Sequence, residues 1–156
     1  YHLGGYEHLC REVATRLIAR GHDVQVLTST FGVQGEAAEP GIYRCLRLES
    51  DVYYYRPQQV LRYRSIQAHN RQVVERTLRE VAPDAVVVWG MWELSKHVAA
   101  QLEESMGVRV LYYLASSWPV ELSAHEAYWD GSDDNALGRS FKRIFRGMVK
   151  ARLGSE

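Results

Sequence analysis

The sequence is poor in cysteine and has no long apolar run. Its 156 residues include two cysteines, Cys10 and Cys45, and no CxxC motif, which argues against a disulfide framework or a zinc finger. The two thiols are predicted to be small buried side chains in a protein of a reducing compartment. No segment approaches the roughly 18 consecutive apolar residues of a membrane-spanning helix, and no basic segment precedes an apolar run as in a signal peptide. These absences favour a cytoplasmic globular protein.

The sequence also carries no net charge at pH 7 with His neutral. The 19 Lys and Arg residues balance the 19 Asp and Glu residues, so the total charge gives no reason to expect nucleic acid as a partner. Hydrophobic residues make up 46% of the chain and charged residues 24%, which is an ordinary globular composition. The length fits one domain with a sizeable core.

Helices and strands are expected to alternate along the chain. Apolar residues recur with helical spacing, and β-branched or alternating runs are typical of strands. The predicted helices cover residues 7–20, 57–81, 94–106 and 137–153, the predicted strands cover 22–29, 42–48, 84–90 and 108–114, and residues 115–136 are expected to be irregular.

This order predicts an α/β fold with a doubly wound parallel sheet, because parallel strands need crossover connections and helices usually supply them. We expect residues 22–28, 85–89 and 108–114 to be parallel strands of one sheet flanked by helices. The last two runs are apolar almost throughout, the pattern of strands buried on both faces. Ligands of such sheets bind at the carboxyl ends of the strands.

The chain opens with a glycine turn, in which Gly4 and Gly5 directly precede the first predicted helix. Backbone N–H groups at a helix N-terminus suit a phosphate or another anion. A Cβ at either glycine is expected to block a close ligand or to force an unfavourable backbone angle. Such a turn normally follows a strand, so a first strand is expected ahead of Gly4. By itself the glycine pair is neither GxGxxG nor a Walker A loop, and a plain turn is the simpler interpretation.

The surrounding sequence makes the glycine pair more informative. "GGYEHLCREVATRLIARGHDVQVLTS" (4–29) resembles the start of glycosyltransferase family 4 enzymes, whose first loop carries Gly-Gly-x-Glu. "PDAVVVWGMWELSKHVAAQLEE" (83–104) and "VRVLYYLASSWP" (108–119) resemble the fourth and fifth strand regions of the same N-terminal domain. The resemblance implies that residues 1–156 form the Rossmann-like, acceptor-side half of a GT-B enzyme. The first strand and the C-terminal donor-binding domain are expected to be missing, since no Glu-x7-Glu pattern of that domain is found.

The resemblance also implies an activity. Family members are retaining enzymes that transfer a sugar from a nucleotide-sugar donor to an acceptor hydroxyl, and they need no metal or other cofactor. The backbone of Gly4 and Gly5 would approach the donor diphosphate, and Glu7 would lie at the helix start. The isolated chain is expected to be inactive, with weak donor affinity at best. Hexosyl transfer in carbohydrate biosynthesis is the expected role.

Cleft-lining residues are expected after the strands. They are Glu7, Trp89, Ser116, Ser117, Trp118 and His125. Many family members have a histidine just after the fifth strand, and this chain has Ala115, Ser116 and Ser117 there. Three alternatives stay open: the Ser116 hydroxyl and backbone groups replace that histidine, His125 takes its place, or the chemistry differs.

Two further segments have aromatic and charged residues that could meet an acceptor. The segment 51–64 interleaves tyrosines with arginines, and a phosphorylated or lipid-linked acceptor would suit it; ordinary surface arginines are slightly favoured. The loop after the predicted strand 108–114 carries Trp118, Tyr128 and Trp129 among carboxylates. Sugar binding and a solvated acidic loop are equally good interpretations there.

The last predicted helix is amphipathic, with cations opposite an apolar stripe. Such a helix can lie on an anionic membrane, so a peripheral contact at the inner face of the membrane is one expectation. Packing of the stripe on the sheet is the favoured alternative.

Two other functions compete with the transferase. One is a non-catalytic nucleotide- or sugar-binding Rossmann-like module. The other is a nicotinamide-dependent oxidoreductase, which the missing GxGxxG and the lack of an acidic residue after the strand at 22–29 disfavour.

Overall fold

The computed structural model describes residues 4–32, 39–51, 55–105, 107–130 and 136–153. Its elements, in chain order, are α1 (Gly5–Ala19), β1 (Val26–Ser29), β2 (Ile42–Leu46), the 3-10 helix η1 (Pro57–Arg62), α2 (Tyr63–Val81), β3 (Ala85–Trp89), α3 (Lys96–Glu104), β4 (Arg109–Tyr113), α4 (Ala124–Asp130) and α5 (Ala136–Leu153). The expected elements are all present. The segment 115–136 is not wholly irregular as expected, because it contains α4.

Local sequence explains several of the helix ends. The side chain of Ser95 accepts a hydrogen bond from the backbone of His97 and so caps the start of α3, which satisfies one free amide of the first turn. Ala82 has a left-handed backbone with φ of 46° and ends α2. Pro83 follows directly and does not continue a helix.

The four described strands form two separate parallel pairs. β1 pairs with β2, from Val26 opposite Ile42 onward, and β3 pairs with β4 in regular register from Ala85 opposite Arg109. The predicted parallel direction is therefore confirmed. The prediction of one sheet is wrong for the described residues, because β1 and β3 are not hydrogen-bonded to each other.

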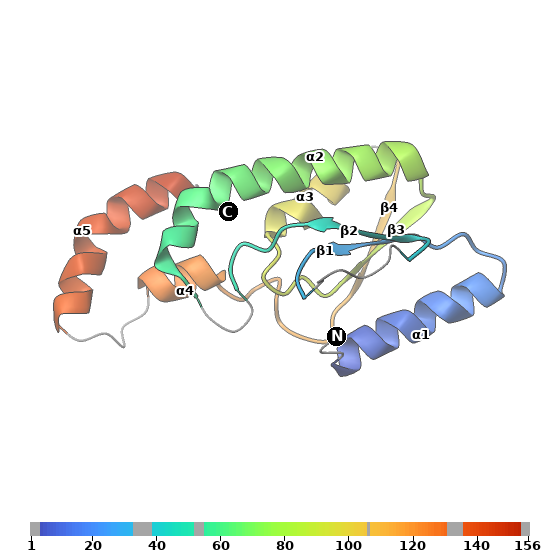
Figure 1. Ribbon diagram of the computed structural model, residues 1–156, viewed down its shortest axis with the longest axis horizontal. Helices are drawn as coiled ribbons and strands as arrows, with labels where there is room; N and C mark the ends of the chain where they lie inside the picture. Colours follow the sequence, from blue (N-terminus) through green and yellow to red (C-terminus); the bar gives the residue numbers. More distant parts are fainter. Residues whose placement is uncertain (1–3, 33–38, 52–54, 106, 131–135, 154–156) are drawn as a thin grey trace.

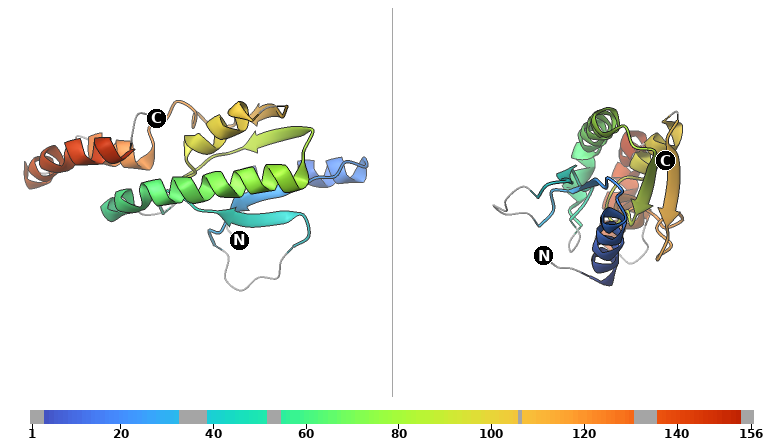
Figure 2. Two further views of the ribbon diagram at one scale, coloured as in Figure 1. Left: turned by 90° about the horizontal axis from the view of Figure 1, so that it is seen from above. Right: turned by 90° about the vertical axis from the view of Figure 1, so that its right-hand side faces the viewer.

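Helices flank the strands on both sides (Figure 1). Seen from above and end-on, the strands lie in the order β2, β1, β3, β4, with a separation between β1 and β3 (Figure 2). α2 lies on one side of this layer and α1 on the other. The described structure is thus a mixed α/β arrangement of short parallel strand pairs rather than a complete doubly wound sheet.

The main core lies between the strands and the α2 and α3 helices. Its buried members are Leu46, Val73, Val74, Val88, Met91, Val98, Ala99, Leu102 and Trp118. The opposite face of the β3–β4 pair is open: Val87 is 49% exposed and Leu111 is 56% exposed. The expectation that these strands are buried on both faces is therefore wrong, since α2 and α3 cover one face.

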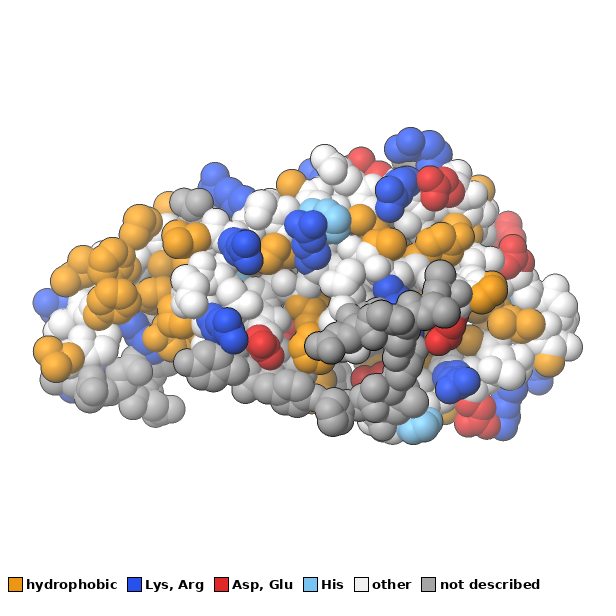
Figure 3. Space-filling model, in the orientation of Figure 1, with side chains coloured by type: hydrophobic (Ala, Val, Ile, Leu, Met, Phe, Trp, Pro, Cys, Tyr) orange, Lys and Arg blue, Asp and Glu red, His pale blue; other side chains and the backbone are white. Residues whose placement is uncertain are grey.

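α5 packs on other helices rather than on the sheet. It contacts η1, α2 and α4, and Val149 is buried there with Val60 and Trp129. Four apolar side chains of its stripe are exposed, namely Leu137, Phe141, Ile144 and Met148. Figure 3 shows hydrophobic side chains gathered at this end of the molecule. The favoured expectation of packing on the sheet is wrong. Among the described helices, none is long and apolar enough to cross a membrane.

Candidate functional site

The glycine turn begins α1. Gly4 is the N-terminal cap, with φ of −75° and ψ of 175°, and Gly5 is the first helical residue. Neither glycine has a positive φ, so the expected backbone strain on adding a Cβ is wrong. A Cβ on Gly5 would meet nothing within 4 Å, and one on Gly4 would lie 2.9 Å from a carboxylate oxygen of Glu7. Space is therefore open outside Gly5.

Tyr6 fastens this turn to the carboxyl ends of β3 and β4. Its hydroxyl donates to the carbonyl of Tyr113 at 3.0 Å and accepts from the backbone N–H of Ala115 at 3.1 Å. The indole N–H of Trp89 donates to the carbonyl of Tyr6 at 3.2 Å. These three hydrogen bonds hold the first turn of α1 at the edge where ligands of parallel sheets bind.

Ring packing reinforces these hydrogen bonds. Trp89 and Tyr113 stack with centroids 4.1 Å apart, and the ring of Tyr6 meets both of them edge-on. Gly90 has φ of 61°, and a Cβ there would lie 2.8 Å from the Tyr6 ring. Glycine is needed at position 90 both for the backbone angle and for the close approach of the ring. We call Tyr6, Trp89 and Tyr113 the edge cluster.

Glu7 is exposed in the first turn of α1. A carboxylate there interacts favourably with the helix dipole, by about 0.3–1 kcal/mol. Its oxygen also lies close to Gly4. An incoming diphosphate would meet this negative charge, so the side chain would have to turn aside for an anion to reach the first-turn amides.

The two serines lie in the exposed loop after β4. Ser116 directly follows Ala115, whose backbone N–H donates to the hydroxyl of Tyr6, and it lies three residues after Tyr113 of the edge cluster. The hydroxyl of Ser117 donates to a carboxylate oxygen of Glu121 at 2.6 Å. The structure therefore links Trp89 to the turn of Gly4 and Gly5 through Tyr6, with Glu7 beside Gly4, and the serines lie in the loop whose first residue, Ala115, is bound to Tyr6.

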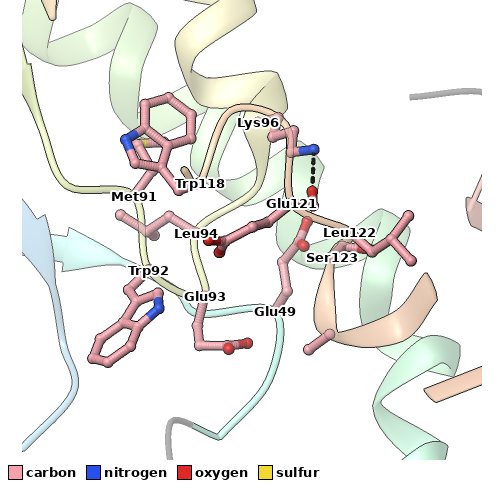
Figure 4. A pocket seen from close by; sticks show the side chains of 11 residues that line it. Glu49, Met91, Trp92, Glu93, Leu94, Lys96, Trp118, Glu121, Leu122 and Ser123 are labelled. Carbon is pink, nitrogen blue, oxygen red and sulfur yellow. Dashed lines mark hydrogen bonds between the residues drawn. The ribbon is translucent and has the colours of Figure 1, made fainter. Parts of the chain in front are cut away.

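A pocket of about 90 Å³ lies among the loops that follow β2, β3 and β4. Its lining residues are Glu49, Met91, Trp92, Glu93, Leu94, Lys96, Trp118, Glu121, Leu122, Ser123 and Ala124. Figure 4 shows three carboxylates around it together with the exposed indole of Trp92. This is the strand edge at which a ligand site was predicted.

Hydrogen bonds tie the pocket loops to one another. The backbone N–H of Glu49 donates to the carbonyl of Glu93 at 2.8 Å, and the hydroxyl of Ser50 donates to the Glu93 carboxylate. The ammonium of Lys96 donates to the carbonyl of Glu121 at 2.7 Å, as Figure 4 shows. Glu93 has φ of 55°, and a non-glycine residue held there is often part of a functional loop.

Trp118 is in the core rather than on an open cleft wall. It is 7% exposed and packs in the main core while also lining the pocket. Its indole N–H is buried without a hydrogen-bond partner, which is uncommon for a buried donor. Most of its ring is unavailable to a sugar.

His125 is completely buried, with 0% exposure. Its Nδ1 is 2.7 Å from the hydroxyl of Tyr55, and the ring of Tyr63 meets it edge-on. Burial lowers the pKa of His125 to about 4, against the opposite effects of the Glu49 backbone and the Glu126 carboxylate. The ring therefore has no surface to offer a cleft in this structure.

The aromatic residues around His125 lie on α4, at the start of α2 and just before η1, and Trp129 of α4 also packs against Val60 of η1 and Val149 of α5. We call Tyr55, Tyr63, His125, Tyr128 and Trp129 the buried cluster. The indole N–H of Trp129 donates to the hydroxyl of Tyr55 at 3.2 Å, and burial raises the pKa of Tyr55 to about 12, with the Trp129 hydrogen bond acting in the opposite direction. The cluster is built for packing.

Two tyrosines that the sequence suggested for acceptor binding are therefore engaged in contacts within the protein. Tyr63 is 0% exposed and Tyr55 is bound to His125, while Tyr53 and Tyr54 lie outside the described residues. The guanidinium of Arg64 donates to the carbonyl of Ala151 at 2.8 Å. Of the loop aromatics, Trp129 is buried as well. Within the described part of the chain, no three His, Cys, Asp or Glu side chains are grouped to hold a metal ion.

Sequence reasoning missed Tyr6, which is the residue that positions the turn. It stands between Gly5 and Glu7 in the motif, and that adjacency was the only available signal. Trp92, Glu93 and Lys96 were missed too, although they follow β3, where the fold places ligands.

The family model described as Glycosyltransferase Family 4 matches residues 3–152. The match runs from the glycine turn to the last turns of α5 and includes both strand pairs. No curated protein and no solved structure matches the chain.

Proposed function

Because this chain belongs to glycosyltransferase family 4, we propose that it is the N-terminal, acceptor-side domain of a retaining glycosyltransferase. The enzyme would move a hexose from a nucleotide-sugar to an acceptor hydroxyl during carbohydrate biosynthesis. The family match supports glycosyl transfer in general. The retaining course and the choice of substrates are our proposal.

One observation carries the proposal: the exposed turn of Gly4 and Gly5 is held at the carboxyl edge of β3 and β4 by Tyr6. First-turn amides have no partner within the helix, and they lie at the positive end of the helix dipole. A diphosphate leaving group gains negative charge as the bond to the sugar breaks. Fixed amide donors stabilise that charge best when they need not reorganise.

In the proposed reaction the bond between the anomeric carbon and the diphosphate oxygen breaks. A bond between the anomeric carbon and the acceptor oxygen forms on the same face of the sugar. The proton of the acceptor hydroxyl passes to the oxygen of the departing diphosphate, and the nucleoside diphosphate leaves as the second product. The described residues would hold the acceptor and the edge of the diphosphate, while a second, donor-binding domain would hold most of the nucleotide.

The pocket after β2, β3 and β4 suits a hydroxyl-rich acceptor. The carboxylates of Glu49, Glu93 and Glu121 line it, and carboxylates accept hydrogen bonds from sugar hydroxyls. Trp92 is 73% exposed at its border and offers a flat apolar face to a sugar ring. A saccharide, free or linked to a lipid, is therefore the proposed acceptor.

Gly5→Val tests the role of the turn in the complete natural polypeptide. An added Cβ meets nothing within 4 Å in the structure, so we expect folding to be little affected while the approach of a diphosphate is blocked. We expect turnover with the best donor of a nucleotide-sugar panel to fall at least about tenfold, equivalent to roughly 1.4 kcal/mol. The melting temperature should change by only a few degrees.

Gly147→Val is the matched control, because Gly147 is also helical with nothing within 4 Å of an added Cβ. It lies on α5 and should leave turnover unchanged. Full activity of a well-folded Gly5→Val enzyme would contradict the proposed role of the glycine turn in the site. Absence of any glycosyl transfer by the complete protein, with nucleotide or sugar binding retained, would favour the non-catalytic module.

A second measurement concerns the chain of residues 1–156 alone. We propose that it has no turnover and binds nucleotide-sugars only weakly, since the donor would be held mainly by the other domain. Calorimetry with the donor panel tests this. Micromolar affinity, or turnover by this chain, would mean that the donor side has been assigned to the wrong half.

We also propose an anionic membrane surface at the cytoplasmic face as a partner of α5. The helix carries six Lys and Arg residues and no acidic residue. Its exposed stripe includes Ile144, which is 74% exposed. Apolar side chains opposite a basic face are typical of helices that lie in a membrane interface.

Co-sedimentation with lipid vesicles tests this partner. Binding is expected to vesicles of mixed phosphatidylcholine and phosphatidylglycerol and to weaken several-fold with Ile144→Glu. Val120→Glu is the control, because Val120 is 83% exposed but lies outside α5. Equal loss with both variants, or no binding to the mixed vesicles, would contradict the membrane contact.

A further inference from the structure

The long helix α2 carries a buried polar side chain beside its apolar core positions. Asn70 is 1% exposed, and the other buried residues of this helix are Tyr63, Val73 and Val74. An amide buried in this way is costly unless its donor and acceptor atoms find partners. The partners of Asn70 therefore indicate its role.

Asn70 binds the backbone of Arg47, the residue directly after β2. Its side-chain oxygen accepts from the backbone N–H of Arg47 at 2.8 Å, and its side-chain nitrogen donates to the carbonyl of Arg47 at 2.9 Å. An amide side chain carries both a donor and an acceptor, so one residue satisfies both backbone groups. The two hydrogen bonds fix the orientation of this part of the chain as well as its distance from α2.

The neighbouring residue of α2 also holds the end of β2. Nε2 of His69 is 2.9 Å from the carbonyl oxygen of Cys45, and this ring nitrogen donates, because a carbonyl oxygen only accepts. Leu46, between the two bound residues, is 3% exposed and packs in the main core. The carboxyl end of β2 is therefore fastened to α2 on both sides of Leu46.

The segment that Asn70 holds leads directly into the pocket wall. Glu49, two residues after Arg47, is 4% exposed and lines the pocket. Its backbone N–H donates to the carbonyl of Glu93 at 2.8 Å, so residues 47–49 are bound to α2 at one end and to the loop after β3 at the other. Consecutive Cα atoms are about 3.8 Å apart, and only Leu48 separates the two bound residues. A displacement of Arg47 therefore reaches Glu49.

We infer that Asn70 is a positioning residue of the acceptor pocket. It fixes the backbone of Arg47 and thereby holds the Glu49 side chain in the pocket wall, although Asn70 is not itself among the described residues that line the pocket. This inference rests on the proposed function of that pocket in acceptor binding. A displaced carboxylate makes poorer hydrogen bonds to acceptor hydroxyls, so the KM for the acceptor depends on Asn70 more strongly than kcat does.

Asn70→Ala in the complete natural polypeptide tests the inference by hydrogen exchange and by kinetics. Exchange in residues 47–50, followed by mass spectrometry, should become at least about tenfold faster relative to β3, because two hydrogen bonds are lost locally. Kinetics are measured with the best donor of the nucleotide-sugar panel and the best acceptor of a panel of methyl hexosides. The KM for that acceptor should rise at least about fivefold, while kcat changes less than about twofold.

Val74→Ala is the matched control, because Val74 is 1% exposed on the same helix and its truncation also weakens the core. It should speed exchange alike in residues 47–50 and in β3, and it should leave the acceptor KM unchanged. Asn70→Asp is a milder variant, which keeps an acceptor for the N–H of Arg47 and loses the donor to its carbonyl. It should give the same separation of KM from kcat if Asn70→Ala folds poorly.

A double-mutant cycle shows whether Asn70 acts through Glu49. In a Glu49→Ala background, Asn70→Ala should cause no further rise in the acceptor KM, because the carboxylate that it positions is gone. A rise as large as in the wild-type background would overturn the inference.

The remaining outcomes separate this inference from the proposed function. Unchanged exchange in residues 47–50, or an acceptor KM that rises equally with Asn70→Ala and Val74→Ala, would overturn the inference. So would an active enzyme in which these residues exchange faster while the acceptor KM stays the same. Faster exchange there in a protein without any glycosyl transfer would instead contradict the proposed function, while confirming that Asn70 positions this wall of the pocket.

Discussion

The edge cluster and the buried cluster are built from the same residue types and serve different ends. Tyr6, Trp89 and Tyr113 are all partly exposed, and they hold a glycine turn whose outer side is open. In the buried cluster, Tyr63 and His125 are fully enclosed and Trp129 nearly so. The first cluster holds the first turn of α1 at the carboxyl ends of β3 and β4, and the second joins the start of α2 to α4. The difference teaches that burial and neighbours, rather than residue type, decide whether an aromatic group can serve a site.

The largest effect is expected from emptying the buried cluster. Trp129→Ala removes a buried indole and its hydrogen bond to Tyr55, and truncations of this kind cost about 3–5 kcal/mol. The free energy of unfolding, measured by chemical denaturation, should fall by that amount. Trp92→Ala is the control, because Trp92 is largely exposed and its truncation should cost under about 0.5 kcal/mol. Similar losses for the two variants would break the comparison.

The second largest effect is expected on lowering the pH, which should reduce the free energy of unfolding through His125 of the buried cluster. The pKa of His125 is lowered from 6.5 to about 4 by burial, so the folded state binds this proton less readily than the unfolded state. Stability should therefore fall as pH falls from about 6.5 to about 4, by at most about 3 kcal/mol. Chemical denaturation curves at several pH values measure this change in the free energy of unfolding with pH.

His125→Gln should flatten that part of the pH profile, even if the variant is less stable at neutral pH. His8→Gln is the control, because His8 is exposed on α1. Its replacement should leave the change in the free energy of unfolding with pH as it is in the wild type. A wild-type profile without loss between these pH values would show that His125 is not enclosed in solution.

A smaller loss is expected at the edge cluster. Tyr6→Phe keeps the ring and removes the hydroxyl that bridges Tyr113 and Ala115, at a cost of about 1–3 kcal/mol. In the complete enzyme, turnover should fall by more than this loss of stability explains, because the glycine turn is no longer held in place. Tyr43→Phe, at an exposed position of β2, is the control and should change neither the free energy of unfolding nor turnover. Turnover that merely follows the melting temperature would give Tyr6 a structural role alone.

The smallest effect is expected from Trp89→Phe. This change removes the indole N–H that donates to the carbonyl of Tyr6 but keeps an aromatic ring against Tyr113. The cost should be about 1 kcal/mol, measured by denaturation. A loss as large as that of Trp129→Ala would mean that the edge cluster is packed as tightly as the buried one.

The fold could be predicted element by element because its signals are local. Helical spacing placed α1, α2, α3 and α5, and β-branched runs placed the strands near their observed bounds. α4 was missed because Ala124–Asp130 is short and its burial depends on η1 and α5. The number of sheets could not be derived either. Periodicity indicates where strands lie in the sequence but not which strands pair with each other.

The site could be predicted in part. The motif with Gly4, Gly5 and Glu7 was recognisable, and the rule that ligands bind at carboxyl edges indicated the loops that form the pocket. The role of Tyr6 could not be inferred, because its partners are Trp89, Tyr113 and Ala115, all more than 80 residues away in the sequence. Nor did the sequence distinguish the exposed Trp92 from the buried Trp118.

By itself, the sequence determined the class of secondary structure, the parallel direction of the strands and the resemblance to a glycosyltransferase family, because these depend on patterns within a few dozen residues. Only the tertiary structure decided that His125 is enclosed, that α5 exposes its apolar stripe and that Tyr6 holds the glycine turn. Each of these depends on which distant side chains exclude water from a group. Solvent exclusion is a property of the packed chain, and no local pattern specifies it.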